Sequence, residues 1–112
     1  MNTVVKILLG IFLAICILVH VYGLRFHTLP ESNLSHVIHL ISYSLCLFTL
    51  LQPVKFRLSL YVLGAVYPFL YHADCFFTPL INQHKFNSIC LLVIVILPFT
   101  GWFLAKQNRP AL

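Results

Sequence analysis

The stretch SNLSHVIHLISYSLCLFTLL, residues 32–51, decides the fold. It holds no charged residue and is long enough to cross a bilayer core of roughly 30 Å, which takes about 20 residues of helix. Small and polar residues recur along it at spacings of three and four, on one face of a helix: Ser32, Ser35, His39, Ser42, Cys46 and Thr49. In lipid such residues mark the surface that packs against another helix. We therefore predict a membrane-spanning helix with a packing seam that includes Ser35, Ser42, Cys46 and Thr49.

The composition of the whole chain agrees with a membrane protein. Of its 112 residues, 61% are hydrophobic and 8% are charged, and the mean hydropathy is +0.98. Soluble domains carry about 25% charged residues, so this chain lacks the polar surface that a soluble domain needs. Its only carboxylates are Glu31 and Asp74, which excludes the common enzyme plans built on several acidic groups. We expect a protein that is not an enzyme.

Three further apolar stretches resemble the first in length. We predict a single domain over residues 1–112, an all-α integral membrane protein with four transmembrane helices in a compact antiparallel bundle. The spans are expected at about residues 4–24, 29–51, 56–72 and 87–105. Thr28 and Glu31 fit a capping box at the start of the second span. Thr78-Pro79 is expected to begin a lead-in helix that continues into the fourth span.

Basic residues predict the orientation, because cytoplasmic loops carry an excess of Lys and Arg. One side of the predicted membrane holds five of them: Lys6, Lys55, Arg57, Lys106 and Arg109. The other side holds Arg25 and Lys85. We expect both termini in the cytoplasm, with the chain in a bacterial inner membrane. The net charge of +5 then suits the anionic lipid of the bilayer. The sequence shows no basic stripe on a soluble face, so we expect no nucleic-acid partner.

The six histidines all fall in the outer half of this scheme. His20 lies about one turn from the outer end of the first span, His36 and His39 lie in the first turns of the second, and His72 closes the third. The remaining two, His27 and His84, fall in outer loops. Ionisable groups at membrane depth are costly and usually functional, so this segregation is the strongest functional signal in the sequence.

Imidazole is the commonest transition-metal ligand near neutral pH. We predict that His20, His36, His39 and His72 are the first-choice metal ligands. Asp74 and Cys75 follow His72 directly and would add oxygen and sulfur donors, a mixture that suits zinc or copper. The cofactor would be a Cu or Zn ion or haem b. No ligand signature such as HExxH or CxxC is present, so the prediction depends on clustering alone.

Seams of small or polar residues are also predicted in the other three spans. The first span carries Cys16, His20, Gly23 and His27. The third carries Tyr61, Ala65, Pro68 and His72. The fourth carries Asn87, Cys90, Ile94, Pro98 and Gly101. If the four seams converge, His20, His39 and His72 point into the bundle near its outer mouth.

Three functions from different classes fit these observations. The first is a small membrane binding or accessory subunit whose histidine cluster holds a metal ion or haem. The second is a purely structural subunit, without ligand, that packs against other membrane subunits or against itself. The third is a small-solute or proton carrier, which Pro68 and Pro98 within the spans favour and the absence of ionisable groups from the inner half opposes.

Overall fold

The computed structural model of the chain describes residues 2–26 and 32–107. It contains four helices, α1 (Asn2–Phe26), α2 (Asn33–Leu51), α3 (Arg57–Gln83) and α4 (Ser88–Gln107). Within those described ranges no strand occurs. Each helix is long and apolar enough to cross a membrane. The predicted all-helical architecture with four potential spans is therefore confirmed.

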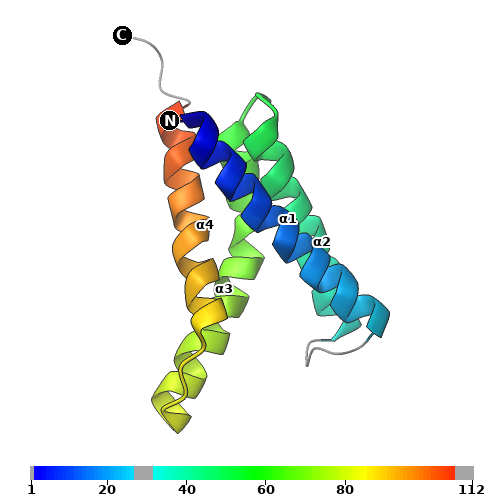
Figure 1. Ribbon diagram of the computed structural model, residues 1–112, viewed down its shortest axis with the longest axis vertical. Coiled ribbons are helices and arrows are strands. Elements are labelled where there is room, and N and C mark those ends of the chain that lie inside the picture. The colour runs from blue at the N-terminus through cyan, green and yellow to red at the C-terminus, as the bar shows by residue number, and fades with distance from the viewer. Residues whose placement is uncertain (1, 27–31, 108–112) are drawn as a thin grey trace.

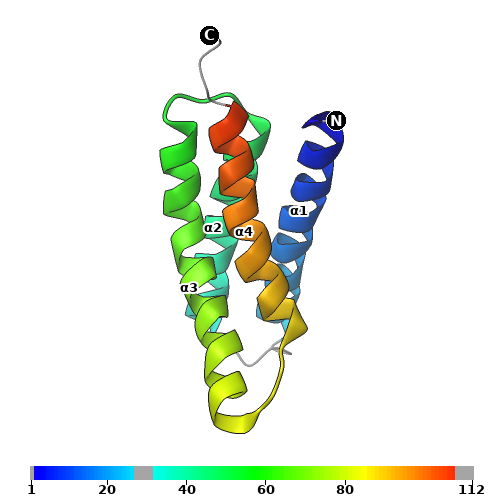
Figure 2. The ribbon, with the colours of Figure 1, turned by 90° about the vertical axis from the view of Figure 1, so that its left-hand side faces the viewer.

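The four helices run up and down side by side. The start of α1, the end of α4 and the α2–α3 connection lie together at one end of the molecule, here called the terminal end (Figures 1 and 2). The α3–α4 connection lies at the other end, here called the opposite end. The antiparallel order follows from the short connections, which allow each helix only to return beside its predecessor.

The four helices share one hydrophobic core, to which α1 contributes Leu9 and Leu13 and α4 contributes Leu97 and Leu104. The closest helix pairs are α1 with α2, α2 with α3 and α3 with α4, and α1 and α4 diverge toward the opposite end (Figure 1). Lipid chains are as apolar as Leu, so two apolar helix faces gain little by leaving lipid for each other.

The predicted start of the second helix needs correction. Ser32 is the N-cap of α2, and its hydroxyl accepts a hydrogen bond from the Ser35 amide at 3.2 Å. The chain at Ser32 is extended, so the helix begins at Asn33. Thr28 and Glu31, the residues of the predicted capping box, lie outside the described residues, as do His27 and Arg109.

The third helix is longer than predicted. α3 continues past His72 to Gln83 and includes both Pro68 and Pro79, so Thr78-Pro79 does not begin a new helix. The predicted span ended at His72. The helix instead continues through Asp74, whose carboxylate accepts a hydrogen bond at 2.9 Å from the Thr78 hydroxyl one turn later. Membrane helices tolerate such prolines where neighbouring groups satisfy the freed backbone.

The packing face of the fourth helix also differs from the prediction. Its buried residues are Cys90, Val93, Leu97, Thr100, Phe103 and Leu104. Of the predicted seam, Cys90 is buried, whereas Asn87 and Pro98 are exposed and Ile94 and Gly101 are half-buried. α4 is apolar on nearly every face, so its few small or polar residues do not mark the side that packs.

The α2–α3 connection is tied down by one side chain. The Arg57 guanidinium donates from Nε to the Thr49 carbonyl and from its terminal nitrogen to the Leu50 carbonyl. These carbonyls belong to the last turn of α2, where the helix leaves acceptors unsatisfied and where a cation suits the helix dipole. Phe56, just before α3, adopts a left-handed conformation with φ 57°, which turns the chain sharply.

Candidate functional site

The structure gathers four histidines from three helices. His20 comes from α1, His36 and His39 from α2, and His72 from α3. All four are buried, with 4%, 1%, 0% and 8% of their respective surfaces exposed. They lie toward the opposite end of the molecule, within the contacts that join α1, α2 and α3. We call this set the histidine cluster.

His39 occupies the centre of the histidine cluster. Its ring stacks on that of His20, with ring centroids 4.3 Å apart and planes 4° from parallel. The His72 ring meets it edge-on, with centroids 5.3 Å apart at 81°. His36 joins through His20, because the two Nδ1 atoms lie 2.8 Å apart at hydrogen-bond distance. One of these two nitrogens therefore donates a proton and the other accepts it.

Main-chain carbonyls orient two of the rings. His39 Nδ1 donates to the Ser35 carbonyl at 2.8 Å, and His72 Nδ1 donates to the Pro68 carbonyl at 2.7 Å. A carbonyl can only accept, so both Nδ1 atoms carry hydrogen. In a neutral ring the lone pair then lies on Nε2. This is the arrangement in which metal-binding imidazoles are commonly held.

Three tyrosines surround the histidine cluster. Tyr43 lies beside both stacked rings, with its centroid 5.6 Å from His20 and 5.8 Å from His39. Tyr67 and Tyr71 meet His39 edge-on at 5.0 Å and 4.8 Å. The Tyr67 hydroxyl also lies 3.2 Å from the Ser35 hydroxyl. None of the three tyrosines was among the predicted site residues, although Tyr43 follows His39 by one helical turn.

The other two predicted metal ligands are placed differently. Asp74 is exposed, and its carboxylate accepts from Thr78 on its own helix. Residues two apart on a helix point about 200° apart, so Asp74 faces away from the side that buries His72. Cys75 is half-buried, about one turn beyond His72. The structure thus brings four of the six predicted ligands together and sets Asp74 apart.

The arrangement of the rings is one of stacking and hydrogen bonding. Within the part of the chain that the structure describes, no group of three or more His, Cys, Asp or Glu side chains is arranged to hold a metal ion. Imidazole lone pairs lie in the ring plane, so the parallel rings of His20 and His39 cannot both direct a nitrogen at an ion between them. Metal binding would require at least one ring to rotate.

The predicted seam of α2 lies in the interface with its neighbours. Ser35, Ser42, Cys46 and Thr49 are all buried. Thr49 donates to the Cys46 carbonyl at 2.8 Å, and the Cys46 thiol lies 3.9 Å from the Tyr61 carbonyl of α3. At Gly64 of α3 the helices are so close that an added Cβ would lie 3.0 Å from the Ser42 carbonyl oxygen. This close approach joins α2 and α3 on the side of the histidine cluster that leads to the terminal end.

His84 serves as a contrast to the histidine cluster. It is exposed and ends α3 in a left-handed conformation with φ 54°, in agreement with the predicted loop position.

Comparison of the chain with models of protein families, with curated proteins and with solved structures found no match.

Proposed function

We propose that this chain is a membrane accessory subunit that binds a transition-metal ion, copper or zinc, at the histidine cluster. The observation that carries the proposal is the gathering of four buried imidazoles from three helices, two of them held by Nδ1 hydrogen bonds to carbonyls. Buried ionisable groups in a membrane domain are costly and usually functional. Four together exceed what is needed to join three helices.

His20 and His36 are the entry point for the ion. Their Nδ1 atoms share one hydrogen bond at 2.8 Å. Zn–N bonds are about 2.0–2.1 Å long, so two nitrogens on a tetrahedral ion lie about 3.3 Å apart. An ion would replace the shared proton if the two Nδ1 atoms moved about 0.5 Å further apart. The Nε2 atoms of His39 and His72 would be the further donors once their rings turn toward the ion.

A single ion suits the histidine cluster better than haem b. Haem iron takes its two axial imidazoles from opposite faces of a porphyrin. His20 and His39 stack at 4.3 Å, which leaves no room for a macrocycle between them. We therefore place copper or zinc first and treat a haem absorption band as an outcome of the test.

The orientation is part of the same proposal. We place the chain in a bacterial inner membrane with both termini on the cytoplasmic side. The histidine cluster then lies toward the outer side of that membrane. The asymmetry of basic residues supports this orientation. Reporter fusions after Gln52 and at Leu112 should then read cytoplasmic, and a fusion after Ile81 should read external. Export of the Leu112 fusion would overturn the orientation.

The test of metal binding is purification in mild detergent from a native membrane, followed by elemental analysis and a visible absorption spectrum. Copper or zinc should be present at about one ion per chain. His36→Gln keeps a hydrogen-bonding side chain but removes the imidazole, and it should reduce affinity about 10–100-fold or more. The matched control is His84→Asn, since Asn tolerates the left-handed conformation; it should leave affinity unchanged.

A structural subunit without ligand is the second candidate. The stacking of His20 on His39 and the Nδ1 hydrogen bonds favour it, because they join α1, α2 and α3 without a metal. In that case the protein is metal-free, and His36→Gln lowers thermal stability without affecting metal content. Metal-free, colourless protein that takes up neither Cu nor Zn would overturn the proposed function.

The polar groups in the terminal half give no support to the carrier alternative. Thr49, Tyr61 and Thr100 are buried there, and each donates to a main-chain carbonyl. These hydroxyls are therefore used within the fold.

A further inference from the structure

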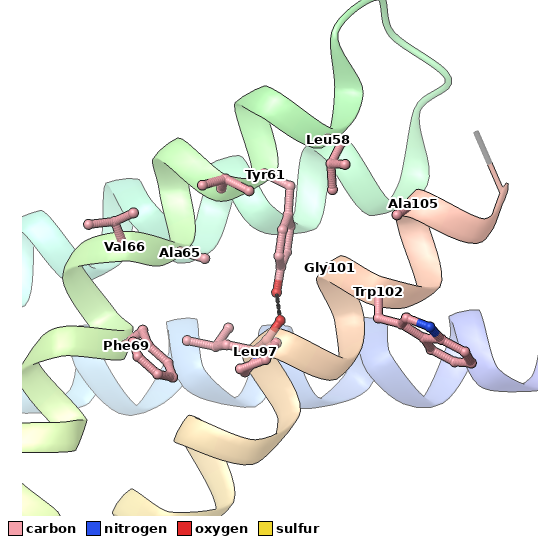
Figure 3. Close-up of a pocket in the computed structure, with 11 residues that line it drawn as sticks. Leu58, Tyr61, Ala65, Val66, Phe69, Leu97, Gly101, Trp102 and Ala105 are labelled. Carbon is pink, nitrogen blue, oxygen red and sulfur yellow. Dashed lines mark hydrogen bonds between the residues drawn. The ribbon is translucent and has the colours of Figure 1, made fainter. Parts of the chain in front are cut away.

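An apolar cleft opens between α3 and α4 in the terminal half of the molecule. It has a volume of about 430 Å³. Its lining includes Tyr61, Ala65, Leu97, Gly101, Trp102 and Ala105 (Figure 3). The histidine cluster belongs to α1, α2 and a later turn of α3, so the cleft is a separate site.

The cleft exists because its lining combines small residues with one ring that is fixed in place. Ala65, Gly101 and Ala105 leave space along both helices. The Tyr61 hydroxyl donates to the Leu97 carbonyl at 2.7 Å (Figure 3), so it is already satisfied. The cleft therefore offers a ligand an almost wholly apolar surface, which suits a hydrocarbon chain.

Positive charge gathers where the cleft meets the terminal end. Lys106 follows Ala105 in the last turn of α4, and its Nζ lies 4.7 Å from the centre of the Trp102 ring. Lys55 is exposed in the α2–α3 connection, just before the turn that carries Leu58 of the cleft. Asp74 is the one carboxylate among the described residues, and it lies toward the opposite end. The cations at the terminal end therefore face no acidic side chain of the described chain.

We propose that the α3–α4 cleft binds an anionic phospholipid. One acyl chain lies against Ala65, Gly101 and Ala105, and the phosphate lies beside Lys106. Both helices are long and apolar enough to span a membrane, so acyl chains have direct access to the cleft. Lysine near the membrane surface attracts anionic headgroups, and Trp102 stands where amphipathic rings settle at the interface.

A second copy of the chain fits the cleft less well. A two-fold contact through this surface would place the same patch of both copies face to face. Two Lys106 side chains would then meet at one mouth, with no described carboxylate to separate them. An anionic lipid instead brings the charge that the mouth lacks.

The experiment is native mass spectrometry of the full chain in mild detergent, with phosphatidylglycerol or phosphatidylcholine added at equal concentration. Phosphatidylglycerol should bind more tightly, by about fivefold for one lysine contact. Lys106→Gln should bring the two lipids to about equal binding. Lys85→Gln, which removes an exposed lysine beyond α3 at the opposite end, is the matched control and should keep the preference.

A second variant tests the cleft itself. Ala105→Phe places a ring in the mouth of the cleft, at a half-buried position, and should reduce the binding of both lipids. Lys106→Gln should reduce only the binding of phosphatidylglycerol. Equal binding of the two lipids by the unmodified chain would overturn the proposal, as would a preference that survives both variants. If the unmodified chain forms dimers and Ala105→Phe abolishes them, the cleft binds a second copy of the chain, and the lipid proposal is also overturned.

Discussion

The α2–α3 and α3–α4 interfaces use the same middle helix in two different ways. At the α2–α3 interface Gly64 brings the two helices into backbone contact, and the α2 face is made of Ser42, Cys46 and Thr49. At the α3–α4 interface apolar residues such as Ala65 and Leu97 line a cleft instead. Close approach through small residues gives helices an attraction that lipid cannot replace. Apolar packing alone leaves lipid as a competitor.

The largest effect is expected at the glycines of these two interfaces. Gly64→Ala would place a Cβ 3.0 Å from the Ser42 carbonyl oxygen and 3.2 Å from the Cys46 sulfur. Because the first neighbour is backbone, α2 must move, and we expect a loss of about 3 kcal/mol in unfolding free energy. Gly101→Ala is the matched control, since its nearest neighbour would be the Tyr61 ring at 3.4 Å. It should be nearly neutral.

Thermal unfolding in detergent measures both variants. Equal losses for Gly64→Ala and Gly101→Ala would remove the distinction between the two interfaces. A neutral Gly64→Ala would show that α2 and α3 are not held at the distance that the structure gives.

A somewhat smaller effect is expected on the two sides of α2. Ser42 is buried in the seam, whereas Ser44 is exposed on the other face of the same helix. Ser42→Leu should overpack the α2–α3 interface and cost about 1–3 kcal/mol. Ser44→Leu, the same chemical change on the exposed face, should leave stability unchanged or raise it in lipid. Similar tolerance at both serines, measured by thermal unfolding, would argue that the seam does not pack.

The contrast between these interfaces also explains what the sequence could predict. The α2 seam was predictable because polar residues in an otherwise apolar helix recur at helical spacing, and the structure buries them. The depth of His20, His39 and His72 along their helices predicted that they would meet, and they do. The position of Tyr43, one helical turn after His39, could have predicted that its ring lies beside the histidines. Nothing else in the sequence distinguishes Tyr43 from the other aromatic residues of the spans.

The α4 face could not be predicted in the same way. Val93, Leu97 and Leu104 are buried, but Leu92, Val95 and Phe99 are just as apolar and are exposed. The predicted end of the third span at His72 was wrong, because the polar residues that follow, such as Asp74 and Thr78, are compatible with helix, and α3 runs on to Gln83. The divergence of α1 and α4 toward the opposite end (Figure 1) corresponds to no local pattern in the sequence.

Arg57 tests how firmly α2 and α3 are joined at the terminal end. Arg57→Ala removes the hydrogen bonds to the Thr49 and Leu50 carbonyls. Hydrogen bonds to charged groups contribute about 1.5–3 kcal/mol, and partial exposure of Arg57 reduces the expected loss to about 1–2 kcal/mol. Lys55→Ala, an exposed neighbour, should have no effect on thermal unfolding. If Lys55→Ala is equally destabilising, net charge and not the carbonyl contact is responsible.

The smallest effect is expected from the hydrogen bond that crosses the α3–α4 interface. Tyr61→Phe removes the bond from the Tyr61 hydroxyl to the Leu97 carbonyl, while Leu97 keeps its place in the helix. Hydrogen bonds between membrane helices average about 0.6 kcal/mol, so the loss of stability should be of that size. Tyr22→Phe, at a ring that is 55% exposed, is the control and should change nothing. A loss above about 2 kcal/mol for Tyr61→Phe, measured by thermal unfolding, would mean that a polar contact holds α4 as firmly as the Gly64 approach holds α2, and the contrast between the two interfaces would fail.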